Sequence, residues 1–491
     1  MIASEAVPWA KTGGLADVLG ALPAALDGLG HRVTLVLPKY RGVRTGVEPP
    51  AIRPAVVRLG AVDHHLRFET LTLSPRRRVI FVDSPAHFDR EGLYAAGGVD
   101  HPDNAERFGL LAQAALDWAD LDAETWPVDV VHAHDWQAGL APAWLALEPR
   151  RWPRLQGAGR VQTIHNLAYQ GVFPRDVVAR LGLPWAVFTI GGGEFWGQLS
   201  FLKAGINYAD VVTTVSPSYA RETLTPQQGA GFDGVLVARR DRYVGILNGI
   251  DTGVWDPAAD PFLPARFDAS DLAGKRTCKR ALLDRVGLPM GDDVLDRPLV
   301  AMVSRLVSQK GLDLVEGAMP SLIDLDATWV FVGTGEARYE AWLRDLASRH
   351  PSRVAVFIGF DEALAHLAEA GADLFLMPSL FEPCGLNQMY SLRYGTVPIV
   401  HGVGGLDDTI QPYTARAKKA NGFKFREATA AALARTVRQA LGVYRNPAVW
   451  HQLIERGMRE DHSWRLSARE YVKVYRRARR DGAVRGPRGA G

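Results

Sequence analysis

Two neighbouring turns in the last third of the chain carry residues suited to chemistry on a phosphorylated substrate. Apolar runs predict two strands, one ending at Met377 and one over Val397–Val400, with a helix from Leu386 to Arg393 between them. Glu382 falls on the first turn, and the pair Gly404-Gly405 follows the second strand. Ligands of parallel α/β sheets bind beyond the carboxyl ends of the strands, where bare amides before a helix can hold an anion. A helix-capping glutamate and ordinary glycine turns are the alternative.

A second charged group follows the predicted strand Leu299–Val303. Arg305 and Lys310 stand near its carboxyl end. Arginine can bind two phosphate oxygens at once, and lysine supplies a compact second charge. Together they could neutralise a diphosphate leaving group without a metal. We expect no metal site, because the two Asp-x-Asp triplets, residues 120–122 and 324–326, are typical of solvated helix ends or connections.

A lysine and a glycine pair also lie near the start of the chain. Lys11 precedes Gly13 and Gly14, and a helix is predicted from Asp17 to Leu29. Backbone amides, the helix N-terminus and the ammonium group would converge on a phosphate. A solvated lysine on a flexible turn is the alternative. Since almost nothing precedes Ser4, we expect either that the first strand of this sheet is cut short or that the true start lies upstream.

Polar residues end two predicted strands in the first half of the chain. His132, His134 and Asp135 follow one apolar run, and His165 and Asn166 follow another. Two histidines and an aspartate could suggest a metal site, but no third ligand cluster lies nearby in sequence. We therefore interpret both strand ends as lining a polar pocket of the size of a sugar.

Length and composition bound the class of protein. A chain of 491 residues is long enough for two domains, and 47% hydrophobic with 23% charged residues is globular. A formal charge of +3 argues against a dedicated nucleic-acid binder. Cys278 and Cys384 form no CxxC motif, which fits a reducing cytosol. Without an apolar run of membrane-spanning length or a leader, we expect a soluble, cytoplasmic protein.

The predicted elements form two α/β series, which indicate two doubly wound domains. We expect an N-terminal domain over residues 1–243, a second domain over 244–463, and an amphipathic helix with an arginine-rich tail over 464–491. Gly229–Gly234 matches G-x-G-x-x-G, but it follows no predicted strand, so we reject a dinucleotide site there.

The motifs together resemble those of bacterial glycogen synthases and plant starch synthases. The resemblance runs from about Ser4 to Trp464, in the expected order and spacing. It rests on KTGGLAD (11–17), HAHDWQAGLAPAWL (132–145), TIHNLAYQGVF (163–173), GQLSFLKAG (197–205), VTTVSPSYARE (212–222), LNGID (247–251), SRLVSQKG (304–311), FEPCGLNQMYSLRYGTVPIV (381–400) and GGLDDT (404–409).

The resemblance implies a retaining glycosyltransferase of the GT-B architecture, in which two Rossmann-like domains face a central cleft. Such an enzyme moves glucose from ADP-glucose to the non-reducing end of an α-1,4-glucan such as glycogen, without a metal or other cofactor. Arg305 and Lys310 would hold the departing diphosphate. Glu382 would lie beside the glucose and oppose positive charge, and His165 would contact the glucose near its reacting carbon.

The resemblance also implies the other residues that bind the substrates. They are Lys11, Gly13, Gly14, Asp17, Tyr94, Asp135, Asn166, Asn248, Gly404 and Gly405. The loop after Tyr94 is shorter than the family pattern leads us to expect. Two alternatives stay open: a transferase that uses UDP-glucose or a small acceptor, and a non-catalytic glucan-binding protein. A third class, a phosphorylase, would need a lysine-bound pyridoxal cofactor, and a colourless purified protein would argue against it. We expect no nucleic-acid or membrane partner.

Overall fold

The computed structural model describes residues 1–44 and 50–485, which form two compact units. The first unit contains residues 1–248 together with the chain from Trp464 onward, and the second contains Gly249–Ser463. The end of the arginine-rich tail, beyond Arg485, lies outside the described residues.

The second unit is a doubly wound parallel sheet of six strands. Their spatial order is β16-β15-β14-β17-β18-β19, and every neighbouring pair is parallel. The strands are β14 (Leu299–Val303), β15 (Thr328–Gly333), β16 (Val354–Ile358), β17 (Leu374–Met377), β18 (Val397–His401) and β19 (Phe423–Phe425). The order reverses between β14 and β17, and such a switch point is where doubly wound sheets bind ligands.

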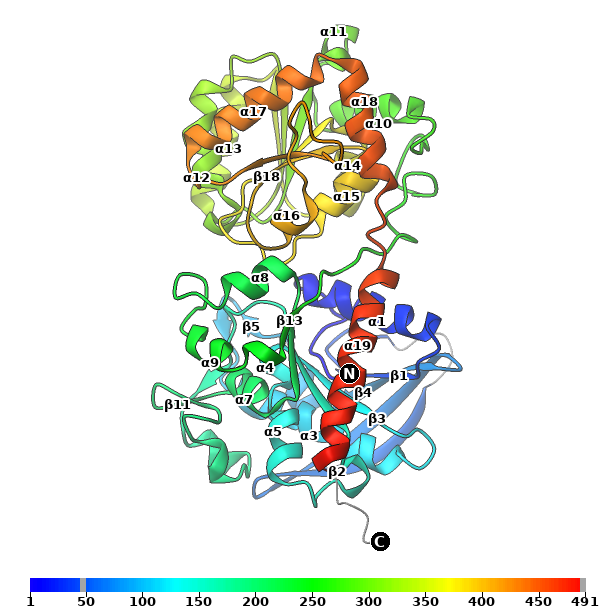
Figure 1. The fold of residues 1–491 in the computed structure, drawn as a ribbon, viewed down its shortest axis with the longest axis vertical. Coiled ribbons are helices and arrows are strands. Elements are labelled where there is room, and N and C mark those ends of the chain that lie inside the picture. Colours follow the sequence, from blue (N-terminus) through cyan, green and yellow to red (C-terminus); the bar gives the residue numbers. More distant parts are fainter. Residues whose placement is uncertain (45–49, 486–491) are drawn as a thin grey trace. The chain divides into compact units, whose positions relative to one another are not determined.

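Helices cover both faces of this sheet, which explains why its strands are continuous apolar runs. Helices α12, α13 and α17 lie on one side, and α10, α14, α15 and α18 lie on the other (Figure 1). Their bounds are α10 (Ala273–Arg285), α12 (Leu312–Ala318), α13 (Ala337–Arg349), α14 (Glu362–Gly371), α15 (Asn387–Arg393), α17 (Ala430–Tyr444) and α18 (Pro447–Arg459). Two short helices, α11 (Asp292–Asp296) and α16 (Gly404–Thr409), complete the unit.

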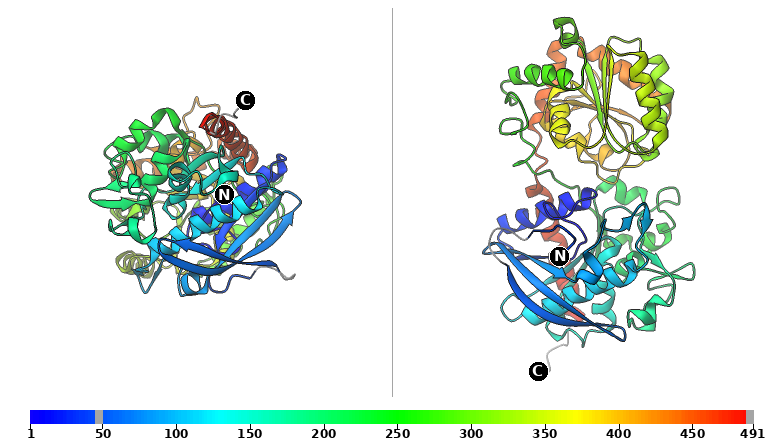
Figure 2. Two further views of the ribbon diagram at one scale, coloured as in Figure 1. Left: turned by 90° about the horizontal axis from the view of Figure 1, so that it is seen from below. Right: turned by 180° about the vertical axis from the view of Figure 1, so that it is seen from behind.

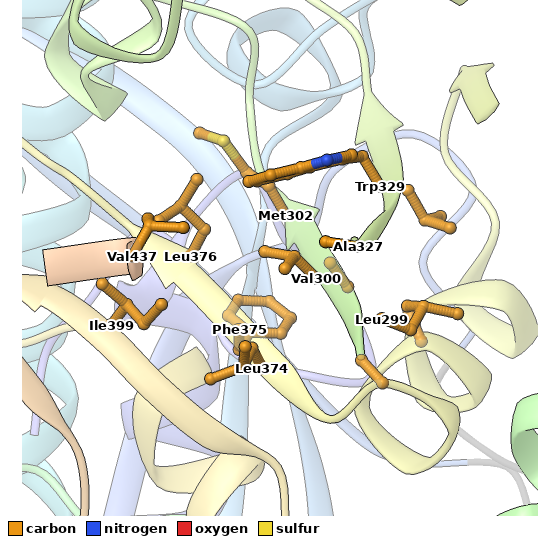
Figure 3. Close-up of a cluster of buried hydrophobic side chains, with 14 of the residues drawn as sticks. Leu299, Val300, Met302, Ala327, Trp329, Leu374, Phe375, Leu376, Ile399 and Val437 are labelled. Carbon is orange, nitrogen blue, oxygen red and sulfur yellow. The ribbon is translucent and has the colours of Figure 1, made fainter. Parts of the chain in front are cut away.

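The core of the second unit fixes the strands whose ends carry the charged residues. Figure 3 shows Val300 and Met302 of β14 beside Trp329 of β15 and Phe375 of β17. All four side chains are buried. Because large apolar side chains pack tightly from three adjacent strands, the carboxyl ends of β14 and β17 are held in a fixed register.

The first unit contains a larger mixed sheet. Two four-stranded parts have the orders β1-β4-β3-β2 and β13-β12-β8-β7. The strands are β1 (Val33–Pro38), β2 (Ala51–Leu59), β3 (Val62–Ser74), β4 (Arg77–Asp83), β7 (Val130–His134), β8 (Gly159–Ile164), β12 (Val211–Thr214) and β13 (Tyr243–Gly245). Strands β2 and β3 form the long blue hairpin in the right-hand view of Figure 2 and pair antiparallel.

The first three residues of the chain join these two parts of the sheet. Ile2 forms parallel bridges with Val36 of β1 and with Ala133 of β7. The Ile2 N–H donates to the His132 carbonyl at 2.9 Å, and the Ala3 N–H donates to the Val36 carbonyl at 3.2 Å. Few as they are, these residues occupy the central position of the sheet. With them, the parallel part of the sheet has the same reversal of strand order as the second unit.

Helices also cover the sheet of the first unit, and one of them comes from the far end of the chain. The main helices are α1 (Gly14–Gly28), α3 (Asn104–Asp122), α4 (Asp135–Ala138), α5 (Leu140–Leu147), α7 (Phe201–Tyr208), α8 (Pro217–Glu222), α9 (Asp233–Ala238) and α19 (Trp464–Arg485). Helix α19 packs against β8 and α1. A Cβ at Gly159 of β8 would lie 2.5 Å from the backbone of Ala478, so α19 lies directly on the strand there.

Candidate active site

The charged residues predicted in the second unit meet at its switch point. Arg305 and Lys310 follow β14, and Glu382 follows β17, the strand beside it. Lys310 Nζ donates to Glu382 Oε2 at 2.5 Å, and Ser379 Oγ donates to the same oxygen at 2.9 Å. Glu382 is 7% exposed. A buried carboxylate with a paired ammonium is thus held where a ligand of this fold would bind.

Arg305 is in a different state from Lys310. It is exposed, and its Nη2 reaches Gln309 Oε1 at a long 3.5 Å. Gln309 is itself held, because its Nε2 donates to the Phe381 carbonyl at 3.2 Å and its carbonyl accepts from the Leu380 N–H at 2.8 Å. The guanidinium of Arg305 therefore keeps donors available to an anion, next to the turn that carries Glu382.

The glycine pair of the second turn packs against the Glu382 turn. Gly404 has a φ of +45°, and a Cβ there would lie 1.9 Å from the Glu382 carbonyl oxygen. A Cβ at Gly405 would lie 1.9 Å from the Cys384 carbonyl oxygen. The Gly405 N–H donates to the Glu382 carbonyl at 3.2 Å. Here the pair supports the Glu382 turn, and donation of its amides to a phosphate stays a prediction.

The predicted lysine-and-glycine loop of the first unit opens α1. Gly13 precedes the helix, Gly14 begins it, and a Cβ at either would meet nothing within 4 Å. Lys11 is half exposed, and its Nζ donates to Asp17 Oδ1 at 2.7 Å. An exposed pair of this kind stabilises a fold by at most about 1 kcal/mol, so a phosphate could displace Asp17 at little cost.

Glu5 binds this loop through hydrogen bonds with Thr12. This residue was not identified from the sequence. Its carboxylate accepts hydrogen bonds from the Thr12 N–H, from the Thr12 hydroxyl at 2.6 Å and from the Tyr94 hydroxyl. Glu5 is 3% exposed. Glu5 comes two residues after Ala3, at the switch point of this unit. This position in the sequence is the signal that could have predicted a role for it.

Tyr94 was predicted to bind substrate, but its hydroxyl is engaged inside the unit. The hydroxyl donates to Glu5 and lies 2.7 Å from Ser4 Oγ. Burial raises the pKa of Tyr94 well above its usual value, and the nearby Tyr40 and Glu5 raise it further. In this structure the side chain supports the Glu5 cluster, and a contact with substrate would require its ring or backbone.

Asp135 begins α4 in a left-handed conformation, with a φ of +54°. Its Oδ1 accepts from the His165 N–H at 2.7 Å, so it fixes the turn after β8. Burial raises the pKa of Asp135 to about 7, although hydrogen bonds from the His165 and Asn166 amides act in the opposite direction. A strained residue whose pKa is shifted toward neutrality is typical of a functional site.

The side chains of His132 and His134 are buried inside the first unit, and both make contacts within it. They are 2% and 0% exposed. His132 Nδ1 lies 2.9 Å from the Tyr475 hydroxyl of α19, and its Nε2 lies 2.6 Å from Thr163 Oγ1. His134 Nδ1 lies 3.0 Å from His165 Nε2. Alternation of side chains along β7 sends both histidines to one face, which is the covered one.

The two predicted asparagines differ in their contacts. Asn166 Oδ1 accepts from the Ala168 N–H at 3.0 Å and shapes its own turn. Asn248 is 6% exposed, and its Oδ1 has no hydrogen-bond partner among the residues that the structure describes. An unpaired buried oxygen costs about 1–3 kcal/mol, and a ligand hydroxyl could satisfy it.

Residues 1–44 and 50–485 contain no cluster of three or more His, Cys, Asp or Glu that could hold a metal ion. They also contain no helix both long and apolar enough to cross a membrane.

Comparison with known proteins gives matches over both units. Residues 1–238 match the family model described as the starch synthase catalytic domain, and residues 292–456 match that of glycosyl transferases group 1. The chain is 52% identical over 479 residues to a glycogen synthase of Anaeromyxobacter dehalogenans, covering 97% of this chain and 98% of that one. It is 47% identical to a glycogen synthase of Myxococcus xanthus, covering 96% and 98%.

Solved structures of related proteins also match this chain, at lower sequence identity. The catalytic domain of starch synthase IV from Arabidopsis thaliana, bound to ADP and acarbose, superposes with a TM-score of 0.86 at 32% identity, covering 97% of this chain and 98% of that chain. A sucrose-phosphate synthase from Thermosynechococcus elongatus superposes with a TM-score of 0.55 at 18% identity, which speaks for the fold alone.

Proposed function

The chain belongs to the glycogen and starch synthase family of glycosyltransferases, and we propose that it transfers glucose from ADP-glucose to the non-reducing end of an α-1,4-glucan with retention of configuration. The predicted family and the GT-B fold class are confirmed. The observation that carries the proposal is the pair of the buried Glu382 with the partly buried Lys310 at the switch point of the second unit.

The cations of the second unit support binding of a diphosphate. Arg305 is exposed and has N–H donors available. Lys310 lies 2.5 Å from the Glu382 carboxylate, and its ammonium group has further N–H donors for a phosphate. As the bond between the sugar and the diphosphate breaks, negative charge grows on the departing oxygen. Positive charges placed beside that oxygen stabilise this growing charge. We propose that they do so without a metal ion.

Glu382 supports stabilisation of the sugar as the same bond breaks. The anomeric carbon gains positive charge, and a buried carboxylate held by Lys310 and Ser379 opposes it. The pairing with Lys310 keeps Glu382 aligned before the donor arrives. Both partners follow parallel neighbouring strands, β14 and β17, which hold them close together.

Retention follows if the acceptor enters on the face from which ADP departs. In the proposed step, the bond between the anomeric carbon and the β-phosphate oxygen breaks with its electron pair going to ADP. The glucan 4-hydroxyl oxygen then bonds to that carbon, and the departing phosphate takes the hydroxyl proton. We propose that Lys11, Gly13, Gly14 and Asp17 bind the same donor, and that His165 and Asn248 contact the sugars.

Incubation with radiolabelled ADP-glucose and glycogen tests the proposal, with UDP-glucose in a parallel reaction. We expect label in the glucan from ADP-glucose, and equal turnover in the presence of a strong chelator. The Lys310→Ala and Glu382→Ala variants should remain folded and lose roughly 10²–10³ in turnover, by analogy with the loss of an oxyanion donor. Lys473→Ala is the matched control, because Lys473 pairs with Glu470 on the exposed side of α19.

The alternatives are separated by the same assay. Faster transfer from UDP-glucose would overturn the choice of donor. Binding of glycogen without incorporation would indicate a glucan-binding protein. Near wild-type turnover of Lys310→Ala or Glu382→Ala would reject the role assigned to that residue, and loss of turnover with chelator would reject the metal-free mechanism.

A further inference from the structure

Behind the turn that carries His165 lies a row of three buried histidines. His132 and His134 come from β7, and His165 follows β8, the neighbouring strand. The rings of His132 and His134 are 3.9 Å apart between centroids, and those of His134 and His165 are 5.3 Å apart. Tyr475 and Thr163 bond both ring nitrogens of His132, so the back of the row is fixed.

The contact between His134 and His165 uses one nitrogen of each ring. His134 Nδ1 and His165 Nε2 are 3.0 Å apart, a hydrogen-bond distance, so one of them carries the proton. Burial lowers the pKa of His134 well below its usual value and lowers that of His165 to about 3. Both rings are therefore neutral at physiological pH, and each carries a single proton on one of its two nitrogens.

The remaining nitrogen of His134 decides which ring donates. His134 Nε2 is buried and has no hydrogen-bond partner among the described residues. If His165 donated, this nitrogen would carry a buried N–H with no acceptor. If His134 donates, the same nitrogen is a bare lone pair. Buried N–H groups without an acceptor are rarer than under-used acceptors, so the second arrangement is favoured.

We propose that His134 is a positioning residue that fixes His165 in the tautomer with its proton on Nδ1, so that His165 presents an N–H donor to an oxygen of the nucleotide sugar. His165 Nδ1 makes no hydrogen bond to any residue of the described chain, and His165 is 8% exposed, so this donor remains for a ligand. The proposal rests on the proposed function in that the ligand is the donor substrate.

Two variants of equal shape test the proposal. Asparagine at position 134 places an amide N–H where Nδ1 lies, whereas leucine has the same outline without a donor. We expect His134→Asn to retain turnover within about fivefold of the wild type, and His134→Leu to lose about 10–100-fold in kcat with little change in KM for the glucan. Thermal unfolding of each variant checks that it is folded.

Nitrogen NMR of protein labelled with ¹⁵N-histidine reads the tautomer directly, and loss of signals in His165→Gln assigns those of His165. We expect the proton on Nδ1 of His165 in the wild type and in His134→Asn, and on Nε2 or exchanging between the two in His134→Leu. A proton on Nε2 in the wild type overturns the proposal, and so does an unchanged tautomer in a folded His134→Leu.

If His134→Leu does not fold, the wild-type and asparagine spectra still decide. Failure of the proposed function would appear instead as no transfer from ADP-glucose, with these spectra unaffected.

Discussion

At the scale of single residues, two carboxylates of the candidate site, Glu382 and Glu5, are buried and held by several donors. Glu382 accepts from Lys310 and Ser379, and Glu5 accepts from Thr12 and Tyr94. Both carboxylates follow central strands of their sheets. A buried carboxylate with several donors is expensive to misplace, since each unpaired group costs about 1–3 kcal/mol. Each therefore fixes the loop around it.

Glu5→Gln tests whether this carboxylate positions the Lys11 loop. The amide of glutamine would place N–H groups against one of the donors, the Thr12 N–H, its hydroxyl or the Tyr94 hydroxyl, and so loosen the loop. We expect KM for the nucleotide sugar to rise about tenfold, equivalent to about 1.4 kcal/mol, with a smaller change in kcat. Tyr94→Phe, which removes one donor and leaves the carboxylate, should have a milder effect. An unchanged KM in Glu5→Gln would contradict this role.

Asp135 should make the folded state less stable as the pH rises, whereas most carboxyl groups do the opposite. Burial raises its pKa from 3.8 to about 7, so between these values the folded state holds a proton that the unfolded state has lost. Unfolding then releases a proton, and the contribution of Asp135 to stability falls as pH rises, by on the order of 4 kcal/mol in total. Relative to the wild type, Asp135→Asn should gain thermal stability steadily from pH 4.5 to pH 7. A constant difference in Tm would show that the pKa is not raised.

At the scale of elements, the apolar runs predicted most strands, because parallel strands covered on both faces must be continuously apolar. The expected strand over residues 299–303 and the expected helix ending at Arg393 agree with β14 and α15. The central strand position of the first unit could not be predicted, since three residues carry no periodicity and their role depends on pairing with both β1 and β7. The burial of His132 could not be predicted either, because Tyr475 of α19, which bonds its ring, lies 343 residues further along the chain.

The close packing of α16 against the Glu382 turn gives a prediction about a single methyl group. In Gly405→Ala the new Cβ would lie 1.9 Å from the Cys384 carbonyl oxygen, so the turn must shift. We expect kcat to fall by at least tenfold, because Glu382 lies two residues from the displaced carbonyl. Gly442→Ala in α17 is the matched control, since its Cβ meets nothing within 4 Å. It should leave kcat unchanged and stabilise the helix by about 0.5–1 kcal/mol. Equal kcat in both variants would contradict the prediction.

At the scale of the whole molecule, the sequence predicted the fold class and the order of the two α/β series. The motifs also predicted which residues stand at the strand ends of the second unit, because strand order and turn position follow from the chain itself. What the motifs could not supply was the direction of each side chain. Tyr94 and Gly405 are engaged by neighbours that are remote in sequence or belong to another turn.

The two units should differ in their response to acid. In the first unit, burial lowers the pKa of several basic groups, which take up protons on unfolding: the Met1 amine, His87, His132, His134 and His165. Each such proton removes about 1.4 kcal/mol of stability per pH unit as the pH falls below the unfolded pKa. Three carboxyl groups with raised pKa oppose this effect but are fewer: Asp117, Asp135 and Asp210. In the second unit the buried Glu369 has a raised pKa, which has the opposite sign.

Scanning calorimetry between pH 7.5 and pH 5.5 checks this difference. We expect two transitions, of which the one from the first unit moves to lower temperature on acidification more than the other. His134→Asn identifies that transition, because removing one histidine should reduce its shift. Two transitions that move in parallel would contradict the prediction.

The return of α19 to the first unit has a consequence for how the polypeptide can be cut. Ile250 bridges Ser463 within the second unit, and Ser467 Oγ donates to the Leu247 carbonyl at 2.5 Å within the first. The chain therefore leaves the first unit and returns to it at neighbouring points, and the same holds for the second unit. This is the arrangement of one domain inserted into another. A short artificial linker from Asn248 to Trp464 could close the first unit alone, and residues 249–463 could be expressed as a separate polypeptide. Nucleotide affinity could then be assigned to either half by titration of two independent proteins.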